Sequence, residues 1–356
     1  MALTDCLTVR AGPGALRHLQ QNGFRADEVR MLVGASGGAK WLVLAGLDKR
    51  IVSEIAPHFS TPVHLLGSSI GSWRFACYAS ADPLAALGRF AERYIHENYG
   101  EKPTANDISR IGEAMIRTIL GEGGIDHVVD HPRYRLHVMA VRARHLLASE
   151  SRPLLAAGLG VAMLANHVSR RTLGGFFERA LVHDARAMPP AAKASDLPMQ
   201  HVPLSKDNLV PAILASSAIP FVMRGVTALP GARPGLYRDG GIIDYHFDVP
   251  LSFDDGLTLY PHFYPHLTPG WFDKKRPGRK PRAKHLDKVL LISPSPQFVA
   301  ELPGGRIPDR HDFVNLPNDE RISRWNTVVS ESERLGDAFM HAIEAQSLAS
   351  LAQPLI

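Results

Sequence analysis

The sequence predicts an α/β fold with a parallel sheet, on three observations. Two short apolar runs, Val29 to Val33 and Val63 to Leu66, end in glycine-rich turns and are each followed by residues at helical spacing. A strand, a helix and a second strand in this order form a β-α-β unit, in which the strands lie parallel. Long helical patterns alternate with further strand candidates, so helices are expected to cover the sheet. These later candidates are residues 134–141, 257–260 and 289–293.

The helical segments are spread over the whole chain. The helical pattern at residues 153–187 is interrupted at Gly174 and Gly175, and Pro220 follows the end of the next pattern. We find neither a repeat nor a low-complexity linker, and therefore expect one α/β domain with helical insertions. Helical patterns cover residues 41–55, 73–78, 82–120, 153–187, 207–217 and 322–349.

The composition is that of an ordinary globular protein, with 45% hydrophobic residues and a net charge of +5 among 356 residues. Two cysteines, Cys6 and Cys77, are too few for a disulfide framework, and the chain lacks the residue spacings of a zinc site. The start of the chain lacks the pattern of a secretory signal, and no apolar run reaches the roughly 18 residues of a membrane span. We expect a soluble, cytoplasmic protein that needs neither a metal nor a cofactor.

Two segments carry a signal for lipid surfaces. The longest apolar run, residues 153–165, is too short to cross a bilayer; we expect a buried helix, with a helix that covers a lipid-facing cleft as the alternative. A basic run directly follows Trp271 and Phe272. Such a run is usually a solvated loop, but aromatic residues beside cations also fit contact between residues 271–284 and an anionic membrane. No nucleic-acid reader module accompanies these charges, so nucleic acid is not an expected partner. The cations are Lys274, Lys275, Arg276, Arg279, Lys280, Arg282 and Lys284.

Ser69 lies at the centre of the motif Gly67-Ser68-Ser69-Ile70-Gly71, between a predicted strand and a predicted helix. In this frame a G-x-S-x-G motif presents a serine as a nucleophile. Gly67 and Gly71 fit a sharp reversal in which a Cβ atom would collide with neighbouring elements. The serine would stand at a helix N-terminus, which favours developing negative charge. A plain Gly/Ser turn is the alternative.

Three other blocks accompany this motif. A glycine-rich loop, Gly34 to Gly38, precedes it, and two further blocks follow it, Ala215-Ser216-Ser217-Ala218-Ile219-Pro220 and Asp239-Gly240-Gly241. In this order, the four blocks resemble the patatin-like phospholipase and acylhydrolase family. The resemblance extends from about residue 29 to residue 250.

The resemblance implies a three-layer α/β/α fold with a mainly parallel central sheet and helical insertions. One domain then spans residues 1–356, with core motifs at 29–250, a helical insertion at about 82–200, and a C-terminal strand and helices at 257–356. It implies a lipid or acyl-ester substrate and a Ser-Asp dyad without histidine, in which Ser69 is the nucleophile and Asp239 its partner. The remaining site residues are the oxyanion donors Gly37, Gly38 and Ala39, and the glycines Gly240 and Gly241, which would hold Asp239 against Ser69.

The loop before the serine departs from the family's pattern, which reads approximately G-G-G-x-R-G. Main-chain N–H groups still suit an oxyanion, but Lys40 lacks the planar fork of arginine, and Ser36 and Trp41 replace glycines. The spacing of Gly34 and Lys40 also resembles a phosphate-binding loop of the type G-x-x-x-x-G-K-[ST]. That interpretation fits badly, because Ala39 and Trp41 stand where the second glycine and the hydroxyl belong.

Two rival functions stay open. An α/β-hydrolase with a Ser-His-Asp triad would combine Ser69 with a downstream histidine, although that fold usually places its nucleophile after more strands than precede Ser69. The other rival binds lipids or membranes with little turnover, as the altered loop and the basic run suggest. Structural roles are expected for His64, Trp73, Phe75, Ser216 and Ser217. The candidate histidines are His262, His266, His285 and His311.

Overall fold

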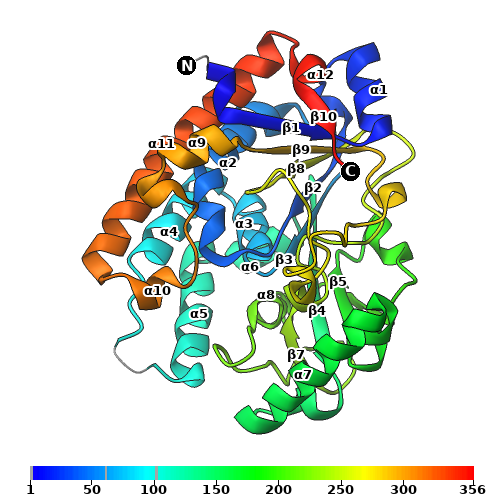
Figure 1. The fold of residues 1–356 in the computed structure, drawn as a ribbon, viewed down its shortest axis with the longest axis vertical. Coiled ribbons are helices and arrows are strands. Elements are labelled where there is room, and N and C mark those ends of the chain that lie inside the picture. Colours follow the sequence, from blue (N-terminus) through cyan, green and yellow to red (C-terminus); the bar gives the residue numbers. More distant parts are fainter. Residues whose placement is uncertain (1–2, 61, 101–102) are drawn as a thin grey trace.

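The computed structural model describes residues 3–60, 62–100 and 103–356. Its centre is a mixed sheet of ten strands in the order β10-β1-β9-β8-β2-β3-β4-β5-β6, with β7 paired to β4 (Figure 1). The strands are β1 (Leu7–Ala11), β2 (Val29–Gly34), β3 (Val63–Ser68), β4 (Tyr134–Ala143), β5 (Phe177–His183), β6 (Met199–Pro203), β7 (Leu236–Asp239), β8 (Leu257–Pro261), β9 (Val289–Pro294) and β10 (Ala352–Pro354).

The central strands of this sheet run parallel. β9, β8, β2, β3 and β4 form consecutive parallel pairs, whereas β1 is antiparallel to β9, and β5 and β7 are antiparallel to β4. Every residue of β3, β8 and β9 is buried, because helices cover both faces of the sheet. This burial explains why these strands appear in the sequence as apolar runs without strict alternation.

Helices on both faces complete the three-layer α/β/α arrangement that the family resemblance implies (Figure 1). The long α11 packs closely on α2: Gly46 donates its N–H to Oγ of Ser332 at 2.8 Å, and a Cβ atom at Gly46 would collide with the Ser332 backbone. The helices are α1 (Pro13–Asn22), α2 (Ala45–Arg50), α3 (Ile70–Tyr78), α4 (Pro83–Ile95), α5 (Ala105–Leu120), α6 (Gly124–Val129), α7 (Arg152–Val168), α8 (Leu209–Ser217), α9 (Pro296–Glu301), α10 (Asp312–Asn315), α11 (Asn318–Glu344) and α12 (Leu348–Leu351).

The helical prediction for residues 153–187 is wrong in its second half. α7 ends at Val168, and Phe177–His183 forms strand β5 between β4 and β6. The apolar residues of this segment have helical spacing, but Glu178 and Arg179 are buried in ion pairs with distant partners. Consequently, the segment at about 82–200 contains β4, β5 and the start of β6 besides its helices.

The short strands β1, β6, β7 and β10 have no counterpart among the predicted elements. Their three to five residues give too little periodicity, and pairing with neighbouring strands decides their conformation. The helical pattern from Trp41 also needs correction, because Gly38–Leu44 forms a 3₁₀ helix before α2 begins.

Candidate active site

Ser69 stands at the turn where β3 ends and α3 begins. Its backbone has φ 53° and ψ −127°, a conformation that residues with a side chain seldom adopt. The N–H of Ser69 donates a hydrogen bond of 2.8 Å to Oγ of Ser216, which in turn donates to the carbonyl of Met139. A buried hydrogen bond therefore holds the turn, which has the strand-turn-helix geometry of a nucleophile elbow.

Close packing requires the two glycines of this motif. A Cβ atom at Gly67 would lie 2.6 Å from the backbone of Ser72, and one at Gly71 would lie 2.0 Å from the carbonyl oxygen of Gly34. Gly34 ends β2, so the first turn of α3 packs directly against the neighbouring strand. A larger residue at position 71 would push the helix, and Ser69 with it, away from the sheet.

Asp239 ends the short strand β7, and its carboxylate contacts Ser69. Oγ of Ser69 donates a hydrogen bond of 2.8 Å to Oδ2, and the N–H of Gly241 donates one of 2.7 Å to Oδ1. Ser69 and Asp239 are both buried, with exposed fractions of 5% and 7%. The fold thus brings together two candidate residues that are 170 positions apart in the sequence.

Gly240 and Gly241 allow the chain after Asp239 to pass close to its neighbours. A Cβ atom at Gly240 would lie 2.1 Å from the carbonyl oxygen of Met139, and one at Gly241 would lie 2.5 Å from Oγ of Ser36. Both glycines have ordinary φ values. They are needed for space rather than for an unusual backbone conformation.

The glycine-rich loop lies beside Ser69 and Asp239. Gly37 and Gly38 line one pocket together with Ser69 and Asp239. Gly38 has φ +57°, a backbone conformation that favours glycine. Ala39 is buried and lies outside the pocket lining. Across the described residues, the N–H groups of Gly37, Gly38 and Ala39 have no acceptor within the protein. The unpaired N–H groups of Gly37 and Gly38 therefore belong to residues that border the pocket, whereas Ala39 does not border it.

The residues that replace glycines in this loop pack against neighbouring elements. Trp41 is buried and stacks on Phe90 of α4, with ring centroids 4.4 Å apart. Oγ of Ser36 donates a hydrogen bond of 3.0 Å to Oγ of Ser68, the residue before the candidate nucleophile. Ser36 thus ties the loop to the end of β3, directly before Ser69, and Trp41 ties it to α4.

A segment late in the chain completes the pocket. Lys40 forms an ion pair with Asp309, whose Oδ1 lies 2.5 Å from Nδ1 of His311. Arg310 lines the same wall. From the sequence, His311 was expected only as a triad candidate, and Asp309 and Arg310 were not predicted because no motif marks this segment.

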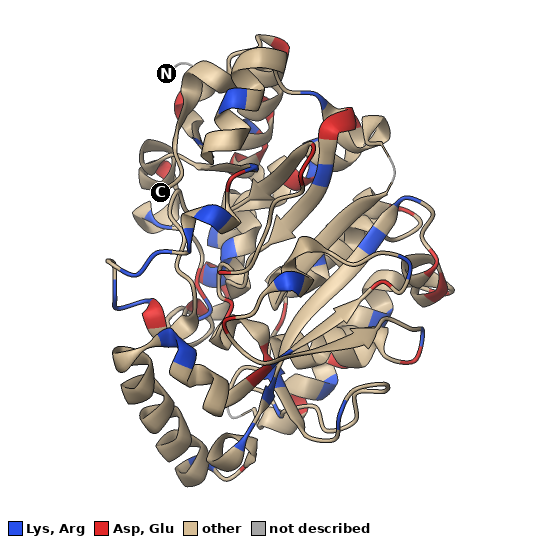
Figure 2. Cartoon of the chain, turned by 90° about the vertical axis from the view of Figure 1, so that its right-hand side faces the viewer, with Lys and Arg blue, Asp and Glu red and all other residues tan. Residues whose placement is uncertain are grey.

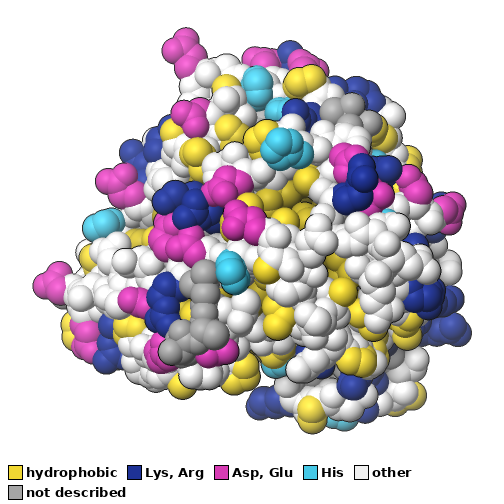
Figure 3. Space-filling model, turned by 90° about the horizontal axis from the view of Figure 1, so that it is seen from above, with side chains coloured by type: hydrophobic (Ala, Val, Ile, Leu, Met, Phe, Trp, Pro, Cys, Tyr) yellow, Lys and Arg dark blue, Asp and Glu magenta, His cyan; other side chains and the backbone are white. Residues whose placement is uncertain are grey.

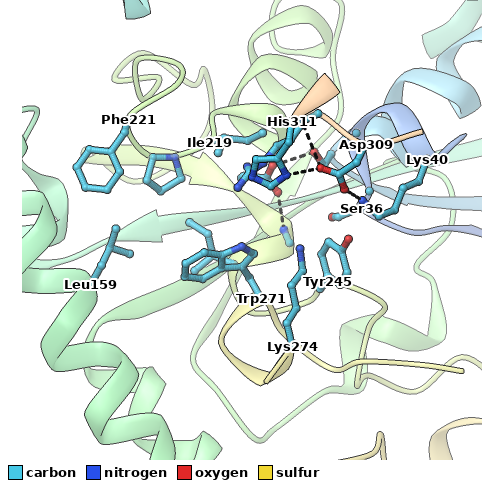
Figure 4. A pocket seen from close by; sticks show the side chains of 18 residues that line it. Ser36, Lys40, Leu159, Ile219, Phe221, Tyr245, Trp271, Lys274, Asp309 and His311 are labelled. Carbon is cyan, nitrogen blue, oxygen red and sulfur yellow. Dashed lines mark hydrogen bonds and ion pairs between the residues drawn. The ribbon is translucent and has the colours of Figure 1, made fainter. Parts of the chain in front are cut away.

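The pocket has a volume of about 370 Å³, within the range of small-molecule sites. Its two ends differ chemically (Figure 4). Leu159, Phe221 and Trp271 form an apolar end, and charged side chains gather at the other. The pocket therefore suits a molecule with an apolar part and a polar part. The residues of the charged end are Lys40, Lys274, Asp309, Arg310 and His311.

Burial alters the protonation of Asp239. It raises the pKa of this carboxyl group to about 6, although the hydrogen bonds from Ser69 and Gly241 and the cations Arg310 and Lys274 act in the opposite direction. At neutral pH the carboxylate is mostly ionised, and it is more basic than an ordinary aspartate.

Lys274 differs from the surface lysine that the basic run predicts. Burial of its ammonium group beside the cations Lys40 and Arg310 lowers its pKa to about 8, and the ammonium lies 4.0 Å from the centre of the Tyr245 ring. Lys274 as a whole residue is nevertheless exposed to solvent. Among the described residues, neither Lys274 nor Arg310 has an ion-pair partner, so both cations remain available to an anion in the pocket.

The four candidate histidines have partners other than Ser69. His262, His266 and His285 lie outside the pocket lining, and Nδ1 of His285, for example, lies 3.0 Å from the carboxylate of Asp248. His311 lines the pocket, but its ring pairs with Asp309 and its side chain is 68% exposed. The hydroxyl of Ser69 instead bonds Asp239.

The other residues singled out in the sequence lie in the interior. Trp73 and Phe75 belong to the core, and Nε1 of Trp73 donates to Oγ of Ser217 at 2.7 Å. His64 and His137 are buried with their ring nitrogens 2.8 Å apart. These contacts are structural.

The basic run between residues 274 and 284 is only partly a solvated loop. Arg276 donates to the carbonyls of Asn166 and His167 at the end of α7, and Arg279 donates to the side chains of Asn166 and Asp273. The remaining lysines at 275, 280 and 284 are exposed. Over the part of the chain that the structure describes, no helix combines the length and hydrophobicity needed to cross a membrane.

Comparison with protein-family models matches residues 50–247 to the patatin-like phospholipases. The match covers more than half of the 356 residues and contains both Ser69 and Asp239. The chain belongs to the patatin-like phospholipase family. This confirms the resemblance found in the sequence.

A solved structure similar to this patatin-like chain is that of VipD from Legionella pneumophila, with a TM-score of 0.28 and 11% sequence identity over 72% of the chain. The chain spans about half of VipD, 53% of its length. Comparison with curated proteins found no match. The loop at 36–41 and the segments around Lys274 and Arg310 lie outside the family match. The charged end of the pocket is therefore built largely from parts of the chain beyond the matched region.

Proposed function

We propose that this protein hydrolyses ester-linked acyl chains of lipids through an acyl-enzyme on Ser69, with Asp239 as the base. The observation that carries the proposal is the hydrogen bond of 2.8 Å from Oγ of Ser69 to Asp239, at the strained turn before α3. A nucleophilic serine needs an adjacent group to take its proton, and Asp239 is the group its hydroxyl contacts.

Acylation then proceeds as follows. The Ser69 hydroxyl gives its proton to Asp239 while its oxygen attacks the ester carbonyl, and the carbonyl π electrons move to the carbonyl oxygen. The N–H groups of Gly37 and Gly38, supported by Ala39, stabilise this oxyanion. Collapse of the tetrahedral intermediate breaks the bond to the alcohol, which leaves with the proton from Asp239. Water then attacks the acyl-enzyme and gives its proton to Asp239. Collapse of the second intermediate breaks the bond to Oγ of Ser69, which takes the proton back from Asp239, and the fatty acid is released.

The raised pKa of Asp239, about 6, supports this role. An ordinary aspartate is a weak base for a serine hydroxyl, and a base is most effective when its pKa lies close to the working pH. The buried position of Asp239 therefore improves its basicity while leaving it ionised at neutral pH.

The two ends of the pocket suggest how a lipid would be oriented. The acyl chain suits the apolar end at Leu159, Phe221 and Trp271, and an anionic head group suits Lys274 and Arg310 at the other end. The scissile ester would then lie at Ser69. This orientation makes an anionic lipid ester the substrate class that the pocket fits best.

The dyad is tested by activity and by labelling. Ser69→Ala and Asp239→Ala are expected to lower kcat for a p-nitrophenyl acyl ester by about a thousandfold or more, and Ser69→Ala to abolish labelling by a fluorophosphonate probe. Ser80→Ala is the matched control, because Ser80 is a buried serine just beyond α3 whose hydroxyl donates to the carbonyl of Cys77. A folded Ser69→Ala protein with unchanged hydrolysis would remove the mechanism.

The rival triad is reduced to one testable histidine, since His311 alone among the four candidates lines the pocket. The dyad predicts that His311→Ala retains labelling at Ser69, whereas a triad predicts its loss. Absence of both labelling and hydrolysis in the folded wild-type protein would instead favour lipid binding without turnover.

A further inference from the structure

Helix α7 is apolar on a side that faces solvent. Residues 153–169 contain no Asp, Glu, Lys or Arg, and Figure 2 shows the helix at the bottom of the view without a coloured charge along its turns. Leu164 is 66% exposed and Val168 is 85% exposed. A helix that is apolar all round normally lies within a protein core or a membrane. Leu154, Val161 and Met163 are exposed on the same helix.

The opposite side of α7 is firmly attached to the protein. Leu155, Gly158 and Ala162 are buried, and the side-chain amide of the buried Asn166 donates to Asp273 at 2.8 Å. Arg276 donates to the last carbonyls of the helix. The exposed apolar side therefore belongs to a well-anchored helix and does not result from loose packing.

This apolar surface continues into the pocket. Leu159, in the middle of α7, lines the pocket together with the exposed Phe221 and Trp271. The guanidinium of Arg152, at the first turn of α7, lies 5.9 Å from the centre of the Phe221 ring. An apolar molecule on the surface of α7 is thus adjacent to the entrance of the pocket.

Cations lie at both ends of α7. Arg152 is exposed at its start, and a shallow hollow beside its end is lined by residues of the basic run. The opposite end of the molecule looks different, with charges of both signs scattered among hydrophobic groups (Figure 3). The combination at α7 is that of an interfacial helix, with an apolar surface flanked by cations. The hollow is lined by His167, Lys275, Arg276, Gly278, Arg279 and Lys280.

We propose that α7 docks the protein on an anionic lipid bilayer. Leu164, Val168 and their exposed neighbours enter the boundary between head groups and acyl chains, while Lys275 and Lys280 contact lipid phosphates. In this position the pocket opens toward the bilayer, so that a lipid enters between Leu159 and Phe221. Only this last step rests on the proposed function, because the docking surface does not include Ser69.

Vesicle binding by the full chain tests the proposal independently of catalysis when it is measured on the Ser69→Ala protein. We expect binding to vesicles of phosphatidylcholine with added phosphatidylserine, and a loss of roughly tenfold in affinity for Leu164→Gln or Val168→Gln. Val314→Gln is the matched control, because Val314 is also a valine with 85% exposure. It lies on α10, apart from α7 in Figure 1, and its substitution is expected to leave binding unchanged.

The charges are tested in the same assay. Lys275→Glu is expected to weaken binding to phosphatidylserine-containing vesicles by roughly tenfold, with little effect on vesicles of phosphatidylcholine alone. Arg17→Glu makes the same change in net charge on α1, at the opposite end of the molecule from α7 (Figure 1), and is expected to have little effect.

Three outcomes overturn the proposal. One is vesicle binding that the α7 variants leave unchanged, and another is an equal loss in the Val314→Gln protein. The third is concentration-dependent dimerisation that the α7 variants abolish, without vesicle binding, which would show that a second copy covers the helix.

Hydrolysis distinguishes the two proposals: the α7 variants should retain activity on a soluble p-nitrophenyl ester and lose it on vesicle lipids. Vesicle binding by a wild-type protein that Ser69 probes never label contradicts only the proposed function.

Discussion

Asp239 and Ser68 pair with adjacent residues of the same strand. Ser68, the last residue of β3, pairs with Met139 of β4, and Asp239, the last residue of β7, pairs with Ala140. Because β7 continues along the edge of β4 where β3 stops, the residue after Ser68 meets Asp239. The pairing of β3 and β7 with β4 therefore fixes Ser69 and Asp239 side by side. The contact between the Ser69 hydroxyl and the Asp239 carboxylate is thus set by the backbone.

The pH dependence of hydrolysis should report Asp239. In the proposed mechanism the ionised Asp239 carboxylate is the base, and the pKa of this group is about 6. We expect kcat/KM for a neutral ester to be constant above this pH and to fall about tenfold per pH unit below it. His311→Gln should leave the profile in place. A profile that loses its acid limb in that variant would assign the base to histidine.

Asp239→Asn should stabilise the fold at neutral pH. The pKa of the carboxyl group rises from 3.8 to about 6 on folding, so the native state binds the proton more tightly and ionisation above about pH 6 destabilises it. We expect a gain of roughly 2 kcal/mol in the free energy of unfolding at pH 8. The gain should shrink as the pH falls from about 6 to 4, when Asp239 itself becomes neutral. Urea unfolding at pH 8 and pH 4.5 measures the difference.

Asp48→Asn is the informative contrast. Asp48 is fully buried and accepts hydrogen bonds of 2.8 Å and 2.5 Å from Arg74. Removing its charge leaves a buried guanidinium without a counterion, so we expect a loss of about 3–5 kcal/mol. A similar loss for Asp239→Asn would contradict the view that the Asp239 carboxylate is held at a cost to stability.

Buried histidines should make the protein sensitive to acid. Burial lowers the pKa of His64 to about 4 and also lowers the pKa of His137 well below its ordinary value. The unfolded chain therefore binds more protons than the native state below pH 6.5, and stability falls as the pH drops from 6.5 toward 4. His64→Gln should reduce the change in Tm between pH 7.5 and pH 5, whereas His58→Gln, at an exposed position, should not.

Lys274 should select for an anionic head group. It has no ion-pair partner among the described residues and lies in the pocket near Arg310. Lys274→Met is expected to raise KM for a short-chain phosphatidic acid by about tenfold, with little change for p-nitrophenyl butyrate. Both substrates are monomeric, so membrane docking does not affect the comparison. Under these conditions Lys275→Met, at the neighbouring lysine, serves as the control. An equal change for both substrates would indicate damage to the pocket rather than loss of head-group binding.

The sequence was most informative where neighbouring residues decide the structure. The turn around Ser69 and the Asp239-Gly240-Gly241 block were recognisable because glycines and small residues are needed where backbones approach closely, as at Gly71 and Gly240. Strand β5 was wrongly predicted as a helix. Its Arg179 is buried in ion pairs with Asp196 and Asp244, and only the fold brings these residues together.

By itself, the sequence determined the order of the strand, turn and helix around Ser69, the mainly parallel sheet and the family, because these depend on local spacing and on the order of motifs. Only the tertiary structure decided that Asp239 touches Ser69, that Lys274 and Arg310 enter the pocket, and that α7 exposes an apolar side. The physical reason is that contact and burial depend on which distant segments pack together. The segment at residues 271–311 lies beyond the recognised motifs, yet it contributes to the pocket because the chain returns to its wall at Trp271, Lys274 and residues 309–311.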